Sequence, residues 1–195
     1  MVHASDASAK TMLRMQMRSL RRELARQTPD AAEQALAHLP PKRLANTRVV
    51  AGYRPQGAEI DPWPLMAAFA RAGATLALPA AASLEAPLVF RAYADGDPLI
   101  PDAVGIPAPT ADASLLEPGL VITPLLAFDR LGGRMGQGGG HYDRTLAALR
   151  AKGEVFALGL AYAGQQLARI PVEPHDQALD AILTEKGYIE VAKDL

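Results

Sequence analysis

Six short apolar runs, separated in places by stretches with helical spacing, constrain the fold of this chain most. The runs lie at residues 48–53, 74–78, 88–93, 120–123, 155–160 and 181–184. Each is short and rich in β-branched or other apolar side chains, so each predicts a strand. Stretches at 64–72 and 142–152 have helical spacing and lie between strands. Strand, helix and strand in this order predict an α/β fold with a mainly parallel sheet flanked by helices.

The N-terminal region predicts two helices. The first covers residues 8–27, and its apolar side chains predict one buried stripe, formed by Leu13, Met17, Leu20 and Leu24. Three basic residues, each four positions apart, fall on another face of this helix: Lys10, Arg14 and Arg18. A basic ridge is by default a solvated face, and it gains a function only beside an anionic ligand. Thr28 resembles an N-cap and Pro29 a first helical residue, which predicts a short second helix to about Leu39.

The totals bound the class of protein. The 195 residues suffice for one domain, which we expect to span residues 1–195. A net charge of −1 gives no reason to expect a nucleic acid or a membrane as a partner. The chain has no cysteine, which fits a reducing cytoplasm, and residues 1–9 lack the apolar core of a secretory signal. We therefore expect a soluble cytoplasmic protein that acts as a monomer on a small molecule.

Residues 132–143 are the segment with the clearest chemical character. Six of the nine residues 132–140 are glycine, and a helical stretch follows them directly. Glycine lets the backbone N–H groups approach an anion closely, and a helix N-terminus adds unpaired N–H groups and a positive dipole. Arg134 adds a fixed positive charge, and Asp143 can bind Mg²⁺ carried by a phosphate. The segment thus predicts a phosphate site after the strand at 120–123, although a flexible surface loop is the alternative interpretation.

Two common nucleotide motifs are absent from this segment. No Gly-Lys-Ser/Thr follows the glycines, which excludes a Walker loop, and no register satisfies G-x-G-x-x-G.

The glycine segment and its surroundings resemble a known family. Residues 124–130 read PLLAFDR and residues 136–144 read GQGGGHYDR, which closely resembles the motif of 5-formyltetrahydrofolate cyclo-ligases. Further resemblances are the basic pair Lys10 and Arg14, the turn GAEID at 57–61, and the segment PVEPHD at 171–176 followed by Leu179 and Asp180. These pieces occur in the family's order along nearly the whole chain.

The resemblance implies a reaction and a fold. Such enzymes use MgATP to convert 5-formyltetrahydrofolate into 5,10-methenyltetrahydrofolate, and they release ADP and phosphate. The formyl oxygen is phosphorylated, N10 attacks the activated carbon, and phosphate leaves as the ring closes. The implied fold is a three-layer α/β/α arrangement with a mixed, mainly parallel sheet, similar to the sugar-phosphate isomerase and CoA-transferase group.

The resemblance also implies roles for individual residues. Catalytic roles fall to Lys10 and Arg134. ATP would be held by Lys10, Thr11, Met12, Leu13, Arg14, Arg134, Met135, Gly136, Gln137, Gly138, Gly139, Gly140, His141 and Tyr142. Folate would be held by Arg54, Glu59, Gln137, Gly138, Gly139, Gly140 and His141, with Glu59 accepting from the pterin donors. The Mg²⁺ ligands would be Asp143 and Asp176. His141 stands where the family more usually has tyrosine.

Two other functions remain open from the residues. One is a paralogue that keeps the ATP loop and acts on another formyl or acyl substrate, and His141 is the feature that favours it. The other is a non-catalytic protein that stores 5-formyltetrahydrofolate. An RNA-binding role for the basic helix is disfavoured, because the chain lacks a pattern of alternating aromatic and basic residues.

Overall fold

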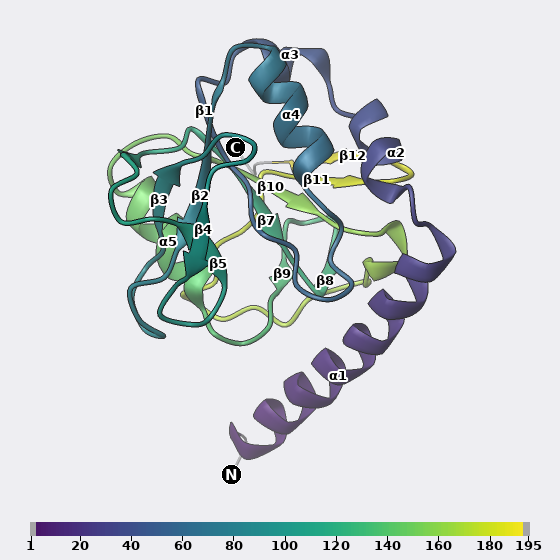
Figure 1. Ribbon diagram of the computed structural model, residues 1–195. Helices are drawn as coiled ribbons and strands as arrows, with labels where there is room; N and C mark the ends of the chain where they lie inside the picture. Colours follow the sequence, from purple (N-terminus) through teal and green to yellow (C-terminus); the bar gives the residue numbers. More distant parts are fainter. Residues whose placement is uncertain (1–2, 193–195) are drawn as a thin grey trace.

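Five parallel strands form the middle of an eight-stranded sheet in this computed structural model, which describes residues 3–192 (Figure 1). The strands of this sheet are β1 (Val49–Ala51), β2 (Thr75–Ala80), β3 (Val89–Ala92), β6 (Leu115–Leu116), β7 (Leu120–Pro124), β10 (Phe156–Leu160), β11 (Ala181–Thr184) and β12 (Gly187–Glu190). Their order is β12-β11-β10-β7-β1-β2-β3-β6, and the pairs at both ends of the sheet are antiparallel. The predicted mixed, mainly parallel sheet is confirmed, and each of the six predicted runs contains a strand.

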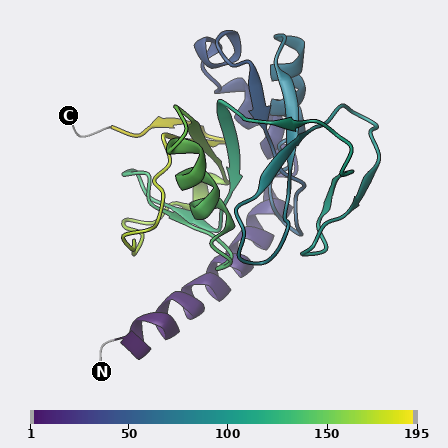
Figure 2. The same ribbon diagram turned by 90° about the vertical axis from the view of Figure 1, so that its left-hand side faces the viewer.

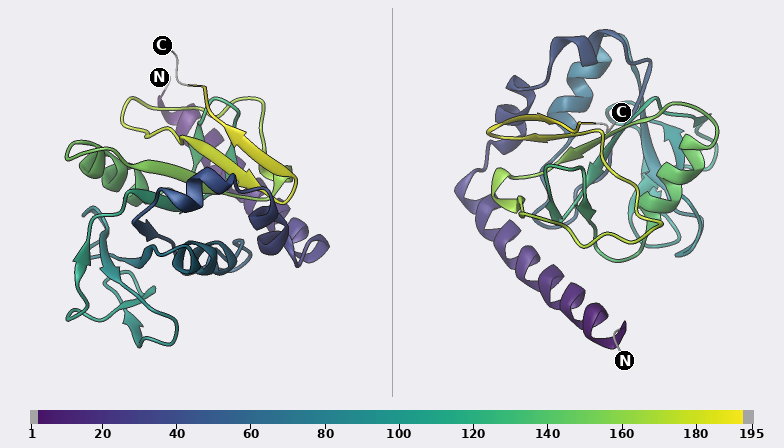
Figure 3. Two further views of the ribbon diagram at one scale, coloured as in Figure 1. Left: turned by 90° about the horizontal axis from the view of Figure 1, so that it is seen from above. Right: turned by 180° about the vertical axis from the view of Figure 1, so that it is seen from behind.

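Side chains along each strand alternate between the two faces of the sheet, so each face carries an apolar layer. One layer packs against α2 (Ala31–Ala37) and α4 (Trp63–Arg71) and includes Val50, Leu76, Ile122, Leu158 and Leu183. The other packs against α5 (His141–Arg150) and includes Ala51, Ala77, Val121, Ala157 and Ile182. Helices therefore cover both faces of the sheet, as Figure 3 shows from above and from behind, and the three-layer prediction is confirmed.

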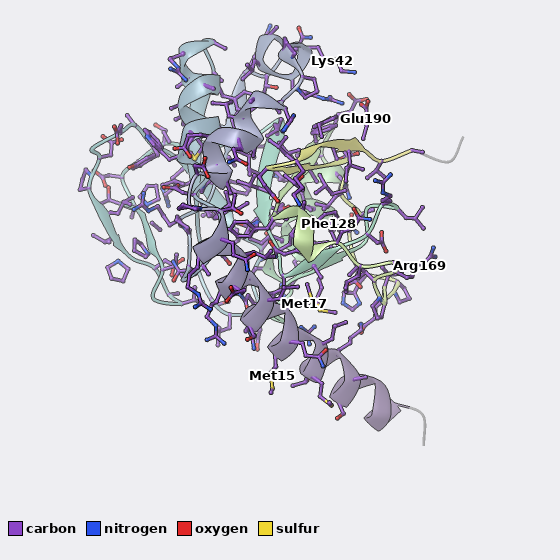
Figure 4. The ribbon with its side chains drawn as sticks, turned by 90° about the vertical axis from the view of Figure 1, so that its right-hand side faces the viewer. Met15, Met17, Lys42, Phe128, Arg169 and Glu190 are labelled. Carbon is purple, nitrogen blue, oxygen red and sulfur yellow. The ribbon has the colours of Figure 1, made fainter. Side chains whose placement is uncertain are left out.

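The first helix, α1 (His3–Gln27), is a long rod whose N-terminal half projects away from the sheet (Figure 2). Met17 is buried and turned toward the body, whereas Met15 points away from it (Figure 4). The predicted stripe is wrong at Leu20, which is 37% exposed, because the buried line continues from Met17 to Arg21 one turn later. An arginine therefore occupies a buried position on this helix.

The second helix begins later than predicted. The N–H of Thr28 donates to Leu24 O at 2.9 Å, so Thr28 still belongs to the end of α1 and does not cap α2. The N-cap of α2 is Asp30, without a side-chain cap bond, and the helix ends at Ala37. An unpredicted helix, α3 (Pro41–Ala45), follows.

A small hairpin separates β7 from the glycines at 136–140. It consists of β8 (Ala127–Phe128) and β9 (Arg134–Met135), and its turn contains Gly132 and Gly133. The prediction of one continuous loop over 132–143 directly after the strand is therefore wrong: only residues 136–140 form the loop that enters α5. Other unpredicted elements are the hairpin of β4 (Leu99–Pro101) and β5 (Pro107–Pro109) and the 3₁₀ turn η1 (Ala163–Gln165).

Two expectations about the whole chain remain predictions. The single domain was predicted over 1–195, and residues 1–2 and 193–195 lie outside the described part. The resemblance to the isomerase and CoA-transferase group is likewise untested. Within residues 3–192, no helix is both long and apolar enough to span a membrane.

Candidate active site

A cavity of about 630 Å³ opens at the carboxyl ends of β1, β2 and β7. Parallel α/β sheets place their sites at this edge. The cavity is lined from the strand ends by Tyr53, Arg54, Pro79, Pro124 and Leu125, from α1 by Lys10, Thr11 and Arg14, and from the glycine loop and α5 by residues 134–143. Segments distant in the sequence therefore converge on one space.

Nearly every residue assigned from the resemblance lines this cavity. The exceptions are Met12 and Leu13, which the structure does not bring to it. Successive residues of a helix point about 100° apart, so Lys10, Thr11 and Arg14 face the cavity while their neighbours turn away. Met12 is 58% exposed, and Leu13 packs against the small apolar cluster around Met17.

Arginine side chains hold the carbonyl groups of the glycine loop. The bonds run from Arg14 Nε to Gly136 O (3.2 Å), from Arg18 Nη2 to Gln137 O (3.4 Å) and from Arg144 Nη2 to Gly139 O (2.8 Å). Arg18 Nε also donates to Gln137 Oε1 at 2.8 Å. Arg18, by default a solvated residue of the basic ridge, therefore contacts the loop.

The amide groups of the same loop are unused. Within the described part of the chain, the backbone N–H groups of residues 136–143 donate to no protein acceptor. Gly138 and Gly140 have φ values of +107° and +65°, a region that favours glycine. Free amides that lead into the N-terminus of a ten-residue helix are suited to bind an anion.

Arg134 and Asp143 form an ion pair at the edge of this anion site. Arg134 Nη2 donates to Asp143 Oδ1 at 2.6 Å, and the backbone N–H of Gln177 donates to the same oxygen at 3.1 Å. The side chain of Arg134 is only 4% exposed. Because Asp176 precedes Gln177 and lines the same cavity, the structure brings the two predicted metal ligands to one side of the site.

The geometry fits a metal ion carried by a nucleotide. No group of three or more acidic, histidine or cysteine side chains suited to a metal occurs among the side chains that the structure describes, those of residues 8–192. Mg²⁺ typically takes one or two carboxylates together with substrate phosphates and water, so two aspartates beside an anion site suffice.

Lys10 forms an ion pair with Glu173, a cavity residue that the sequence reasoning missed. The ammonium of Lys10 lowers the pKa of the Glu173 carboxyl below its ordinary value, mainly through their hydrogen bond. His175 Nε2 lies 3.6 Å from Glu173 Oε2 and 3.7 Å from Asp176 Oδ1. A single acidic residue in a loop carries no sequence signal for such a contact.

Glu59 lines the cavity as a buried carboxylate, with a side chain that is 7% exposed. Its Oε1 accepts from Arg21 Nη1 at 3.1 Å, and its Oε2 accepts from the backbone N–H of Gln56 at 2.9 Å. Burial, and secondly the charge of Glu59, raise the pKa values of Tyr53 and Tyr142, so both phenols stay protonated. Apart from Glu59 and Tyr142, these residues were not predicted as site residues.

His141 lines the cavity where the glycine loop meets α5. Its Nδ1 is buried and has no hydrogen-bond partner among the described residues. The ring lies against the backbone of Gly139, where an added Cβ would meet His141 Cδ2 at 3.1 Å. The loop therefore packs closely against the ring of His141, whose Nδ1 remains without a hydrogen-bond partner in the described part of the chain.

The fold and the cavity define a class: an α/β protein with a glycine-rich anion site at the carboxyl edge of a mainly parallel sheet. A model of the 5-formyltetrahydrofolate cyclo-ligase family matches residues 6–185. The chain therefore belongs to the 5-formyltetrahydrofolate cyclo-ligase family, and it is a ligase of folate one-carbon metabolism.

Relatives resemble the chain over almost its whole length. It is 32% identical to a 5-formyltetrahydrofolate cyclo-ligase of Mycolicibacterium smegmatis, over 93% of this chain and 96% of the relative. Identity to that of Escherichia coli K12 is 33%, over 89% and 96%. The solved structure of Aquifex aeolicus 5,10-methenyltetrahydrofolate synthetase superposes with a TM-score of 0.78 at 25% identity, covering 95% of this chain and 94% of that one.

Proposed function

We propose that this cavity converts 5-formyltetrahydrofolate into 5,10-methenyltetrahydrofolate at the expense of MgATP. The observation that carries the proposal is the union of two sites in one space: an anion site made of free amides, and a buried carboxylate at Glu59. The first suits a triphosphate, and the second suits a heterocycle rich in N–H donors. Residues 137–141 line the same cavity, and we assign to them the place where the transferred phosphoryl group meets the formyl oxygen.

At the nucleotide end, the chain supplies positioning and charge. The amides of residues 136–143 cradle phosphate oxygens, and Lys10, Arg14 and Arg134 neutralise their charge. Asp143 and Asp176 would hold Mg²⁺, which supplies further neutralisation of the phosphates when bound. Lys10 pairs with Glu173 in the structure, so a nucleotide phosphate would compete with this carboxylate for the ammonium.

At the folate end, the chain orients the acceptor of the phosphoryl group. Glu59 accepts from the amino and ring N–H donors of the pterin, and Arg54 lies exposed at the cavity with a charge that suits a carboxylate of the substrate. The N10 atom is a weakly basic aryl amine and needs no protein base to attack. Catalysis therefore rests on holding two substrates in contact.

The test is turnover with a matched pair of variants. The protein is incubated with MgATP and 5-formyltetrahydrofolate, and the near-ultraviolet absorbance of the methenyl product is followed. Asp143→Asn should lower kcat/KM at least a hundredfold with the fold intact, because a metal-binding charge is lost. Asp95→Asn, on an exposed loop, should be unchanged. Absence of product with the wild type would refute the reaction, and near-normal turnover of Asp143→Asn would refute the metal role.

We also propose that the protein acts as a monomer, since one chain supplies all parts of the cavity. Light scattering at assay concentrations tests this, and a dimer would contradict it. The expected cytoplasmic location stays a prediction.

A further inference from the structure

Arg21 is a buried arginine that does not line the cavity, although its carboxylate partner does. It lies on α1, three turns after Lys10. Its Nη1 donates to Glu59 Oε1 at 3.1 Å and to Leu125 O at 3.3 Å. The side chains of Arg21 and Glu59 are each only 7% exposed.

The contribution of the Arg21–Glu59 ion pair to folding stability does not by itself explain why the pair is buried. Removing two charges from water costs several kcal/mol per ion, and an apolar pair of similar volume is often as stable. Arg21 Nε is also buried without an acceptor among the described residues, which adds to the cost. The pair is therefore better explained by what it does to Glu59.

The hydrogen bonds of Glu59 fix the direction of its carboxylate. Arg21 binds one oxygen and the backbone N–H of Gln56 binds the other, at 2.9 Å. Each carboxylate oxygen accepts about two hydrogen bonds, so each retains capacity. Glu59 lines the cavity and Arg21 does not, so a ligand in the cavity can use this remaining capacity while Arg21 stays bound behind it.

We propose that Arg21 is a positioning residue for the folate: its bond to Oε1, together with the bond of the Gln56 N–H to Oε2, holds the Glu59 carboxylate ready for two adjacent N–H donors. The amino and ring N–H groups on the pyrimidine edge of 5-formyltetrahydrofolate form such a pair. This proposal rests on the proposed function, which places the pterin at Glu59. It makes folate affinity, and not nucleotide affinity, depend on a residue outside the cavity wall.

The test measures binding of 5-formyltetrahydrofolate and of a non-hydrolysable ATP analogue separately, by calorimetry, on full-length variants. Arg21→Met should weaken folate binding about tenfold to a hundredfold and change nucleotide binding less than twofold. Arg21→Lys retains the charge and should recover part of the affinity. The matched control is Arg22→Met, an exposed arginine on the same helix, which should bind both ligands as the wild type does.

A double-mutant cycle separates positioning from a structural role. In the Glu59→Gln background, Arg21→Met should cause little further loss of folate affinity, because Arg21 acts through that carboxylate. Additive losses, or a parallel loss of nucleotide affinity in Arg21→Lys, would overturn the proposal. If Arg21→Met does not fold, the double variant Arg21→Met/Glu59→Gln still provides the test. This double variant has no unpaired buried charge, and its folate affinity can be compared with that of Glu59→Gln.

The outcomes also distinguish this proposal from the one on which it rests. No folate binding by the wild type would refute the proposed function. Folate binding that Glu59→Gln leaves unchanged would refute the pterin site. Weaker binding by Glu59→Gln but not by Arg21→Met would refute only the role of Arg21.

Discussion

Asp129 joins two segments that line the proposed nucleotide site, and its substitution gives the sharpest test of the architecture. Its carboxylate is 2% exposed and accepts only backbone N–H groups in the described structure. Oδ1 accepts from Leu131 and Gly133 at 2.9 Å each, and Oδ2 accepts from Ile170 at 2.8 Å. The first two lie in the hairpin turn before Arg134, and the third begins the segment that leads to residues 171–176.

The expected cost of Asp129→Asn follows from these bonds. An asparagine can keep one oxygen toward the hairpin turn, but its NH₂ group then faces the N–H of Ile170. One charge-assisted bond is lost, at about 1.5–3 kcal/mol, and a buried donor is left unpaired, at about 1–3 kcal/mol. We expect a loss of about 3–5 kcal/mol in the free energy of unfolding. Weaker nucleotide binding should accompany it, because Asp176 lies on the released segment.

Urea unfolding and calorimetry with an ATP analogue measure the two effects. Asp97→Asn is the matched control, because Asp97 also accepts a backbone N–H, from Ala94 at 2.7 Å, but on an exposed turn. That variant should stay within about 0.5 kcal/mol of the wild type. A similarly small loss of unfolding free energy for Asp129→Asn would refute the reasoning, because the buried carboxylate would then not stabilise the two segments that it binds.

Two further predictions concern a contact and a packing limit. Glu173→Gln should tighten binding of an ATP analogue several-fold at neutral pH by freeing Lys10; equal or weaker binding contradicts this. Because Lys10 lowers the Glu173 pKa, the pair persists at neutral pH and is lost as pH falls through that lowered pKa, so the difference between variant and wild type should vanish in acid. Gly159→Ala should lower the free energy of unfolding by about 1–3 kcal/mol, because the new Cβ would lie 2.6 Å from Leu179 Cδ1. Gly153→Ala is the control, because its Cβ would enter open space. Equal free energies of unfolding for the two variants would contradict the packing argument.

The central sheet was predictable because its strands are buried on both faces. Such strands are short continuous apolar runs, and the two layers of the core repeat that pattern in β1, β2, β7, β10 and β11. The small hairpins lack this signal. The strands β8 and β9 have two residues each and are held by the buried carboxylate of Asp129 and by pairing with each other, neither of which has a periodic pattern.

The site was predictable where its chemistry is local in the sequence. The glycines, Arg134 and Asp143 lie within twelve residues, so their meaning could be inferred from composition and from the helix that follows. Glu173 and Arg21 acquire their roles only through partners 163 and 38 residues away. The helical spacing of apolar residues wrongly predicts that Leu20 is buried. Arg21 occupies the buried position instead, where it contacts the carboxylate of Glu59.

Helix α1 links the two ends of the cavity. Lys10 and Arg14 line the part of the cavity where we propose the nucleotide, and Arg21 holds Glu59, where we propose the folate. Eleven residues of α-helix rise about 16 Å, so one rigid element supplies charge at both ends of the space. Its N-terminal half projects beyond the sheet, and its buried contacts are concentrated near Met17 and Arg21 (Figures 2 and 4). A shift of α1 would therefore disturb Lys10 and Glu59 together, so the proposed sites predict that weaker packing of this helix lowers the affinity for both substrates.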